Sequence, residues 1–244
     1  FAQNGFVYLF YVHEDDPFTY SGPKTSRLVR VTAMGDEADP ATEVVLIGGI
    51  PADSPSHNGG ALRFGPDGAL WITTGDASSF NAVDTRALRT QQLDSLAGKL
   101  LRVGTDGRGL AGNPFWNGDA DAVRSKVYAY GFRNPFRLTF RPGTGRPYIA
   151  DVGANDWEEV NAVVRGGNHG WPCVEGPLPQ AGYQALAECQ ALYAQGAGAV
   201  AATAVIAVVF NGVATLMAHA LHALVSRYLG GRSLDIVRVV TASL

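Results

Sequence analysis

The stretch LRFGPDGALWI at residues 62–72 consists of two short apolar segments joined by a Pro-Asp-Gly turn. Segments rich in β-branched and aromatic residues, with Gly, Pro and Asp between them, predict antiparallel hairpins. A similar stretch, LTFRPGTGRPYI, starts 76 residues later and covers residues 138–149. The chain is therefore predicted to repeat one β-sheet unit.

Two other pairs of segments recur in the same order. Residues 27–31 (RLVRV) resemble 99–103 (KLLRV), and residues 43–49 (EVVLIGG) resemble 126–132 (KVYAYGF). A long-period repeat of about four strands is typical of β-propeller blades, which bury their faces only against neighbouring blades. We predict an all-β fold, a partial and incomplete β-propeller of four-stranded blades. An all-β sandwich with a chance internal echo is the alternative.

Composition divides the chain in two. The 244 residues carry a formal net charge of −3, with 46% hydrophobic and 17% charged residues. This balance is ordinary for a soluble protein and lacks the basic surface expected of a nucleic-acid-binding protein. Charged residues become rare after Gly176, where alanine and valine dominate. We therefore predict a propeller domain at residues 1–195 and an apolar tail at residues 196–244.

The two ends of the chain each allow two interpretations. Residues 199–225 form an almost uncharged run that predicts a helix and is long enough to span a membrane. This tail is either the product of a shifted reading frame, and so no part of a native propeller, or a membrane-anchor-like helix. The chain begins FAQNG, without Met or a secretory signal, and runs directly into a β-prone segment. We interpret it as a fragment whose start is missing, against the alternative of a mature cytosolic protein.

Both cysteines, Cys173 and Cys189, lie around a loop that contains Pro and Gly. A pair at this spacing can close a short loop as a disulfide, which would indicate an oxidising compartment. Two unrelated buried thiols are the alternative. The disulfide interpretation favours a secreted or periplasmic location.

Polar residues occupy equivalent loops of two successive repeats. His57 precedes an innermost strand, and Arg133 and Asn134 occupy the matching loop one unit later. Asp76 follows the second strand of one hairpin, and residues 151–154 follow the matching strand of the next. In a propeller these loops open on the same face near the central channel, so we expect the side chains to converge. Taken singly, each has an ordinary structural explanation, and a lone histidine is more often structural than catalytic.

A series of segments in order carries a family resemblance. The series is HNGGALRFGPDG at 57–68 with Gly75-Asp76, LDSLAGKLLRV at 93–103, YGFRNP at 130–135, DVGANDWEEVN at 151–161 and GGNHGWP at 166–172. It resembles the glucose/sorbosone dehydrogenase family over residues 1–195. The resemblance implies the N-terminal half of a six-bladed β-propeller, and a soluble aldose sugar dehydrogenase that depends on pyrroloquinoline quinone (PQQ).

This resemblance also implies a reaction and roles for individual residues. The family oxidises the C1 hydroxyl of an aldose to a lactone and passes hydride to PQQ bound beside calcium. His57 resembles the general base, because an imidazole suits proton abstraction near neutral pH. Asp76 resembles the carboxylate that orients this imidazole. Arg133 resembles the group that polarises the quinone carbonyl and stabilises the developing oxyanion.

Other residues would hold the cofactor and the metal. Asn134 would hydrogen-bond the quinone together with Arg133, and the backbone carbonyls of Gly153 and Ala154 resemble calcium ligands. The implied partners are a small sugar and an external electron acceptor, with no nucleic acid, and with a membrane only if residues 199–225 are a genuine span. The family's basic residues for the cofactor's carboxylates lie on later blades, so this chain by itself is expected to be inactive.

Two further functions compete with this one. A calcium-dependent propeller lactonase would require a cage of side-chain carboxylates, which the Gly153-Ala154 turn does not supply. A non-catalytic secreted propeller used for protein binding would need neither His57 nor its partners Asp76 and Arg133. Which sugar is oxidised depends on loops whose specificity the sequence does not reveal.

Overall fold

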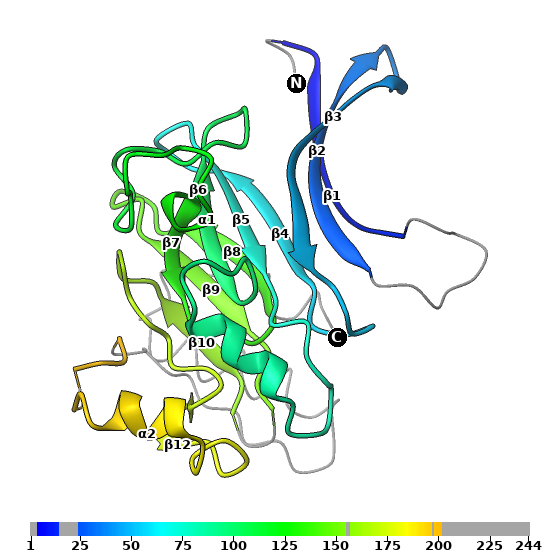
Figure 1. Cartoon of the computed structure of the whole chain (residues 1–244). Helices are drawn as coiled ribbons and strands as arrows, with labels where there is room; N and C mark the ends of the chain where they lie inside the picture. The colour runs from blue at the N-terminus through cyan, green and yellow to red at the C-terminus, as the bar shows by residue number, and fades with distance from the viewer. Residues whose placement is uncertain (1–3, 15–23, 155–156, 197, 202–244) are drawn as a thin grey trace, which may run out of the picture.

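The computed structural model describes residues 4–14, 24–154, 157–196 and 198–201 (Figure 1). Within these residues the larger sheets form three successive blades. The first blade contains β1 (Phe6–His13), β2 (Thr25–Met34) and β3 (Glu37–Pro51). The second contains β4 (Gly59–Phe64), β5 (Leu70–Thr74), β6 (Lys99–Val103) and β7 (Val127–Tyr130). The third contains β8 (Pro135–Phe140), β9 (Pro147–Asp151) and β10 (Glu159–Ala162), with β9 in the middle.

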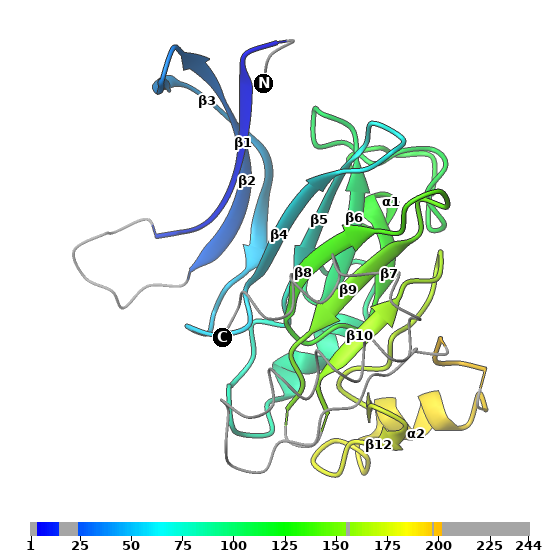
Figure 2. The same ribbon diagram turned by 180° about the vertical axis from the view of Figure 1, so that it is seen from behind.

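Short elements lie in the connections between strands and after the third blade. Two helical turns lie inside the second blade, namely the 3-10 helix η1 (Thr85–Gln91) and α1 (Val123–Lys126). After the third blade come the small hairpin β11 (Val174–Glu175) and β12 (Leu178–Pro179), and then α2 (Ala187–Tyr193). Figures 1 and 2 show α2 and β12 together at one end of the molecule, beyond β10.

The internal repeat of the sequence corresponds to equivalent strands of successive blades. Residues 27–31 lie in β2 and residues 99–103 form β6, each followed by the outer strand of its blade. The stretches 62–72 and 138–149 form the matching hairpins β4–β5 and β8–β9. Among the described residues the second blade has the four strands predicted. The described parts of the first and third blades have three strands each. Strands β1–β3 correspond to β5–β7 of the second blade, and β8–β10 correspond to β4–β6.

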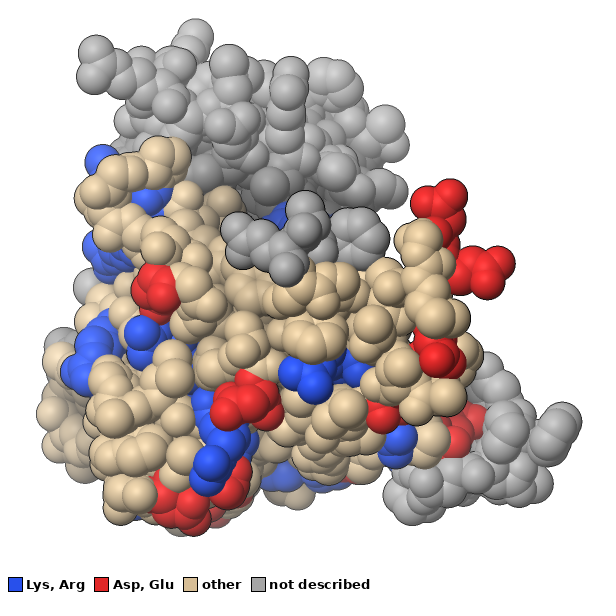
Figure 3. Space-filling view, turned by 90° about the horizontal axis from the view of Figure 1, so that it is seen from above, with Lys and Arg blue, Asp and Glu red and all other residues tan. Residues whose placement is uncertain are grey.

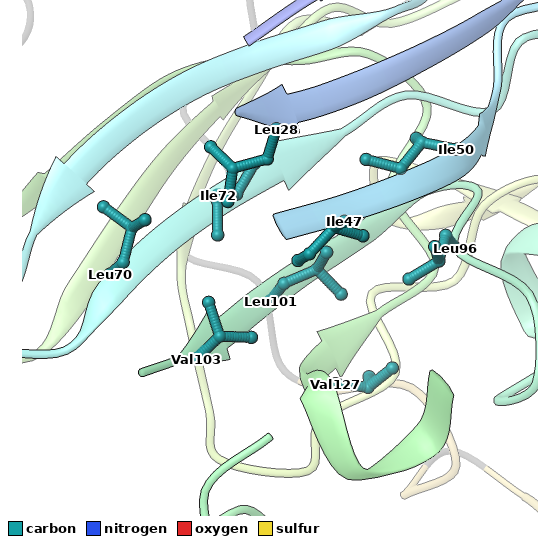
Figure 4. Packing of buried hydrophobic residues seen from close by; sticks show 9 residues of the cluster. All are labelled: Leu28, Ile47, Ile50, Leu70, Ile72, Leu96, Leu101, Val103 and Val127. Atoms are coloured by element: carbon teal, nitrogen blue, oxygen red, sulfur yellow. The ribbon is translucent and has the colours of Figure 1, made fainter. Parts of the chain in front are cut away.

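Blades pack face to face through alternating side chains of β5 and β6. Leu70 and Ile72 of β5 join Leu28 and Ile47 of the first blade in one buried cluster (Figure 4). The intervening Trp71 faces the other way and packs with the third blade's cluster, which includes Leu138 and Ile149. Successive side chains of a strand point to opposite faces, so a blade covered on both sides has continuously buried strands. This explains why every residue of β5 is buried.

A third cluster forms around the disulfide that joins Cys173 to Cys189. Trp171, Tyr183 and Leu192 are buried with the two sulfurs. The bond therefore ties α2 to the loop that follows the third blade. The described part of the tail also packs here, since Ala199 and Val200 contact this cluster and the Ala201 N–H donates to the Asn168 carbonyl at 2.7 Å.

Residues 202–244 lie outside the described residues, and so does most of the apolar run 199–225. Both interpretations of that run therefore stay predictions. None of the helices that the structure describes is long and apolar enough to cross a membrane. Figure 3 shows Lys and Arg side chains interspersed with Asp and Glu side chains over the face seen from above.

The disulfide should stabilise the fold measurably. Replacing both cysteines, Cys173→Ser with Cys189→Ser, should lower the free energy of unfolding by about 3 kcal/mol, because the bond closes a loop with a sequence separation of 16. Urea denaturation of the oxidised chain and of the double variant measures the difference. Reductant should lower the stability of the wild-type chain to that of the variant and leave the variant unchanged. Equal urea midpoints of the oxidised chain and the variant would contradict the prediction.

Candidate active site

Loops of the second and third blades meet at one end of their innermost strands. His57 lies between β3 and β4, Asp76 follows β5, and Arg133 with Asn134 lies between β7 and β8. Backbone hydrogen bonds join these loops directly: the Asp76 N–H donates to the Arg133 carbonyl at 2.8 Å, and the Val152 N–H donates to the Asn134 carbonyl at 3.1 Å. The Asn134 side-chain oxygen accepts the Gly59 N–H at 3.2 Å. The convergence expected from repeat position is thus present in the structure.

His57 and Asp76 form a buried pair. The His57 Nδ1 lies 3.0 Å from Asp76 Oδ1, and the two residues are 4% and 0% exposed. His57 has a φ of 59°, in the left-handed region where a non-glycine residue is strained. A Cβ on Gly75 would lie 1.8 Å from the His57 carbonyl oxygen, so only glycine allows this approach. The histidine loop is therefore pressed against the strand end that carries Asp76.

Asp76 accepts hydrogen bonds at both carboxylate oxygens. Besides His57, Oδ1 accepts the Ser78 N–H at 2.8 Å. The other oxygen, Oδ2, accepts the Ser78 hydroxyl and the Trp171 Nε1–H, each at 2.7 Å. Hydrogen bonds to the charged form of a carboxylate favour that form, and these offset the cost of its burial. The site therefore holds a buried carboxylate that faces the imidazole.

Arg133 is the buried cation of the site. Its Nη1 donates to the Gly153 carbonyl at 2.6 Å and to the Val152 carbonyl at 3.2 Å, and its Nη2 donates to the Phe80 carbonyl at 3.0 Å. The guanidinium carbon also lies 5.3 Å from the centre of the Trp171 ring, a cation–π distance. Burial lowers the pKa of Arg133, and the carboxylates of Asp76 and Asp151 act in the opposite direction. A guanidinium keeps its charge even so.

Three buried polar atoms at this site have no hydrogen-bond partner among the described residues. They are His57 Nε2, Asn58 Oδ1 and Arg133 Nε. A buried polar atom left unpaired is costly, so such atoms concentrate where a ligand is bound. One acceptor-capable nitrogen, one acceptor oxygen and one cationic donor suit a polar molecule with hydroxyl and carbonyl groups, such as a sugar or a quinone.

Several carboxyl groups lie around the turn after β9, and two of them, Asp151 and Glu175, are buried. Burial raises the pKa of Glu158 to about 7 and raises the pKa of Glu159 and of Asp151, the last well above its usual value. The Gly153 N–H donates to Glu158 at 3.2 Å and the Ala154 N–H donates to Glu175 at 2.6 Å. Backbone N–H groups therefore hold these carboxyl groups around residues 153–154, while burial disfavours their charged forms.

This turn fits a hard cation in donor type, since it offers backbone and carboxyl oxygens. Calcium prefers oxygen ligands such as backbone carbonyls and carboxylates. The Gly153 carbonyl, however, already accepts a hydrogen bond from Arg133. A carbonyl oxygen has two lone pairs, so calcium at Gly153 would share this oxygen with Arg133 or displace it. Within the residues that the structure describes, no group of three or more His, Cys, Asp and Glu side chains is arranged to hold a metal ion.

Comparison with known proteins identifies the family. The family model "Glucose / Sorbosone dehydrogenase" matches residues 1–203. The chain belongs to the glucose/sorbosone dehydrogenase family. Its fold is that of the β-propeller sugar dehydrogenases. The match extends to residue 203, somewhat beyond the predicted domain boundary at 195, and covers every described residue of the tail.

Individual relatives agree with this assignment. The chain is 31% identical to the quinoprotein glucose dehydrogenase B of Acinetobacter calcoaceticus over 196 residues, which is 75% of this chain and 40% of that protein. It is 34% identical to the HIPL2 protein of Arabidopsis thaliana over 60% of this chain and 24% of that protein. The PQQ-bound aldose sugar dehydrogenase of Streptomyces coelicolor superposes with a TM-score of 0.57 at 30% identity, covering 74% of this chain and 47% of the other. The chain spans half or less of the length of these relatives.

Sequence reasoning named His57, Asp76, Arg133, Asn134 and the 153–154 turn, and the structure brings all of them together. It assigned no role to Ser78, Trp171, Glu158 or Glu175, which contact the same groups. Trp171 lies in the GGNHGWP segment that carried the resemblance, far from Asp76 in sequence. Only the contact itself reveals its connection to the site.

Another histidine, His169, resembles His57 in burial but not in surroundings. Its Nδ1 lies 3.1 Å from the Asn161 side-chain oxygen, and its ring stacks on Phe132 with 4.6 Å between ring centres. Burial lowers the pKa of His169 from 6.5 to about 3, with a smaller contribution from Arg146. It is therefore a neutral core residue with no carboxylate to orient it.

His169 should make the fold sensitive to acid. Below pH 6.5 His169 is protonated in the unfolded chain, whereas in the folded chain it stays neutral down to about pH 3. The free energy of unfolding should therefore fall, at this position, by about 1.4 kcal/mol per pH unit across that window. In His169→Asn the dependence on pH should be shallower by that amount. Urea denaturation at pH 8, 6 and 5 measures it, and the pH 8 value isolates the packing loss. Parallel pH profiles for the two proteins would contradict the assignment.

Proposed function

We propose that this chain is part of a PQQ-dependent sugar dehydrogenase, which oxidises the C1 hydroxyl of an aldose to a lactone. The chain would supply the general base and the cationic side chain of the active site. The observation that carries the proposal is the buried His57–Asp76 pair, in which His57 Nε2 has no hydrogen-bond partner among the described residues. A sugar hydroxyl offers the proton that such a nitrogen accepts. Membership of the family and a PQQ-bound relative of the same fold support the proposal.

His57 would act as general base. An anionic acceptor at Nδ1 favours the tautomer in which the proton sits on Nδ1, so the Nε2 lone pair is available. That nitrogen would take the proton of the C1 hydroxyl as the C1–O bond becomes a carbonyl. The imidazolium that results lies 3.0 Å from Asp76, whose charge stabilises it. Asp76 therefore orients the base before the proton transfer and compensates its charge afterwards.

Arg133 would stabilise negative charge that develops beside the sugar. Its position is fixed by three backbone carbonyls and by the Trp171 ring, so it needs no reorganisation during the reaction. Bound PQQ would supply the hydride acceptor for the oxidation at C1. Asn134 would hydrogen-bond the quinone, and the carbonyls of Gly153 and Ala154 would hold calcium near it.

The wider setting belongs to the same proposal. The Cys173–Cys189 disulfide favours an oxidising compartment, which suits a secreted or periplasmic enzyme. An external electron acceptor would finally take the two electrons removed from the sugar. A lactonase would need a carboxylate cage for its metal, and the residues that the structure describes contain no such group. A protein-binding propeller would gain nothing from a strained, buried histidine paired with aspartate.

The decisive experiment uses a parent-length protein with its later blades, reconstituted with PQQ and calcium. His57→Ala should reduce sugar-dependent dye reduction by about 100- to 10,000-fold, because a positioned general base typically contributes that much. Titration of the cofactor by absorbance should be nearly unchanged in His57→Ala. Arg133→Ala should lower turnover and also alter the quinone spectrum. The turnover of Asp76→Asn should lie between those of His57→Ala and Arg133→Ala.

His169→Asn at pH 8 is the matched control, since it removes another buried histidine with an unpartnered Nε2. It should keep the wild-type rate. Near-normal turnover in His57→Ala would overturn the proposed mechanism and leave the propeller as a scaffold.

A further inference from the structure

Trp171 touches both charged groups of the candidate site. Its Nε1–H donates to Asp76 Oδ2 at 2.7 Å, and the Arg133 guanidinium lies over its ring at 5.3 Å. The residue is 5% exposed. We propose that Trp171 is a positioning residue, which fixes the Asp76 carboxylate so that Oδ1 stays directed at His57 Nδ1. The inference rests on the proposed function, in which His57 is the base.

A carboxylate can rotate about its terminal bond, so one fixed oxygen determines the direction of the other. Trp171 and the Ser78 hydroxyl together hold Oδ2 of Asp76. Oδ1 is then left for the His57 ring and the Ser78 N–H. Both donors on Oδ2 are neutral, so they orient the carboxylate without cancelling the charge that it presents to the imidazole. A lysine or arginine in their place would neutralise it.

Hydrogen bonds of its backbone and a ring contact hold Trp171 in place. Its N–H donates to the Gly131 carbonyl at 3.0 Å, and its carbonyl accepts the Thr90 hydroxyl at 2.6 Å and the Gln91 side-chain amide at 2.7 Å. The Tyr183 ring meets the indole edge-on, with ring centres 5.5 Å apart. The indole therefore has a defined position, as an orienting donor requires.

Lys99 anchors the helix that presents Thr90 and Gln91. Its ammonium is fully buried and donates to the carbonyls of Arg89, Thr90 and Ala97, at 3.2, 2.8 and 2.5 Å. Its three donors are thus satisfied by η1 and the segment after it. Lys99 supports Trp171 from a distance, while Trp171 makes the contact with Asp76.

The chain contains a matched control for the indole donor. Trp71 is also buried and its Nε1–H also donates to an aspartate, Asp67 Oδ1, at 3.2 Å. This pair lies at the β4–β5 turn and makes no contact with His57 or Asp76 that the structure records. Trp171→Phe and Trp71→Phe therefore delete the same chemical group from an Asp-paired tryptophan, inside and outside the site.

The test reads the His57 tautomer in this chain, without quinone or sugar. The chain is labelled with ¹⁵N-histidine, His57→Gln assigns the His57 signal, and long-range ¹H–¹⁵N spectra at pH 8 report which ring nitrogen carries the proton. The wild-type ring should be protonated at Nδ1. Trp171→Phe should shift the tautomer ratio toward Nε2–H about tenfold, the scale of one hydrogen bond to a charged group. Trp71→Phe should leave the ratio unchanged.

Ser78→Ala removes the other donor on Oδ2 and should shift the ratio in the same direction. It keeps the test informative if Trp171→Phe fails to fold, which amide spectra of each variant reveal. An unchanged His57 tautomer in a folded Trp171→Phe or Ser78→Ala chain would overturn the inference. An equal shift in Trp71→Phe would do so as well, because the effect would then be a general loss of packing.

The tautomer measurement also separates this inference from the proposed function. In the reconstituted parent-length protein, Trp171→Phe should lower kcat with little change in KM, since the base is misdirected while the sugar's contacts remain. If the tautomer shifts but the wild-type parent reduces no dye with any aldose, the proposed function fails and Trp171 still positions Asp76. If dye reduction depends on His57 and the tautomer does not respond to Trp171, the inference fails alone.

Discussion

Backbone hydrogen bonds at three glycines join the strand ends of the second blade to the loop that carries Trp171, at the end of the molecule that carries the site. The Gly98 N–H donates to the Gly75 carbonyl, the Gly131 N–H to the Gly98 carbonyl, and the Trp171 N–H to the Gly131 carbonyl, at 2.8, 3.1 and 3.0 Å. This ladder crosses from the end of β5 to the loop of the disulfide. A Cβ on Gly98 would lie 2.4 Å from the Phe132 carbonyl oxygen, so a side chain there would force the loops apart. Asp76, Arg133 and Trp171 project from loops joined by this ladder, and the His57 loop is tied to it by the Ala77 N–H, which donates to the His57 carbonyl at 3.1 Å.

The close approach of backbones explains why the site can bury so much charge. Buried charges are tolerated when hydrogen bonds replace the water they lose. Backbone groups supply many of those bonds: Arg133 donates to the carbonyls of Val152, Gly153 and Phe80, and Asp76 accepts the Ser78 N–H. The charges then stay at fixed positions, as general-base and electrostatic catalysis require. The same packing imposes the strained φ of His57, a cost that the surrounding contacts offset.

The disulfide loop links stability to the candidate site. Trp171 belongs both to the buried cluster around Cys173 and Cys189 and to the hydrogen bonds of Asp76. A residue that serves the core and the site at once transmits changes in one to the other.

The sequence determined the blade architecture, because alternating apolar segments and glycine-bearing turns act over a few residues and recur at a fixed period. It also named His57, Asp76, Arg133 and Asn134, since repeat position places equivalent loops on one face. The predicted four strands are present in the second blade, and the described parts of the first and third blades have three, because the count depends on which strands find neighbours to pair with. The role of Trp171 could not be predicted, because its partner Asp76 lies 95 residues away in the sequence. Such contacts exist only after the blades have packed, so the tertiary structure decided which ordinary tryptophan holds the aspartate and which buried histidine faces an acid.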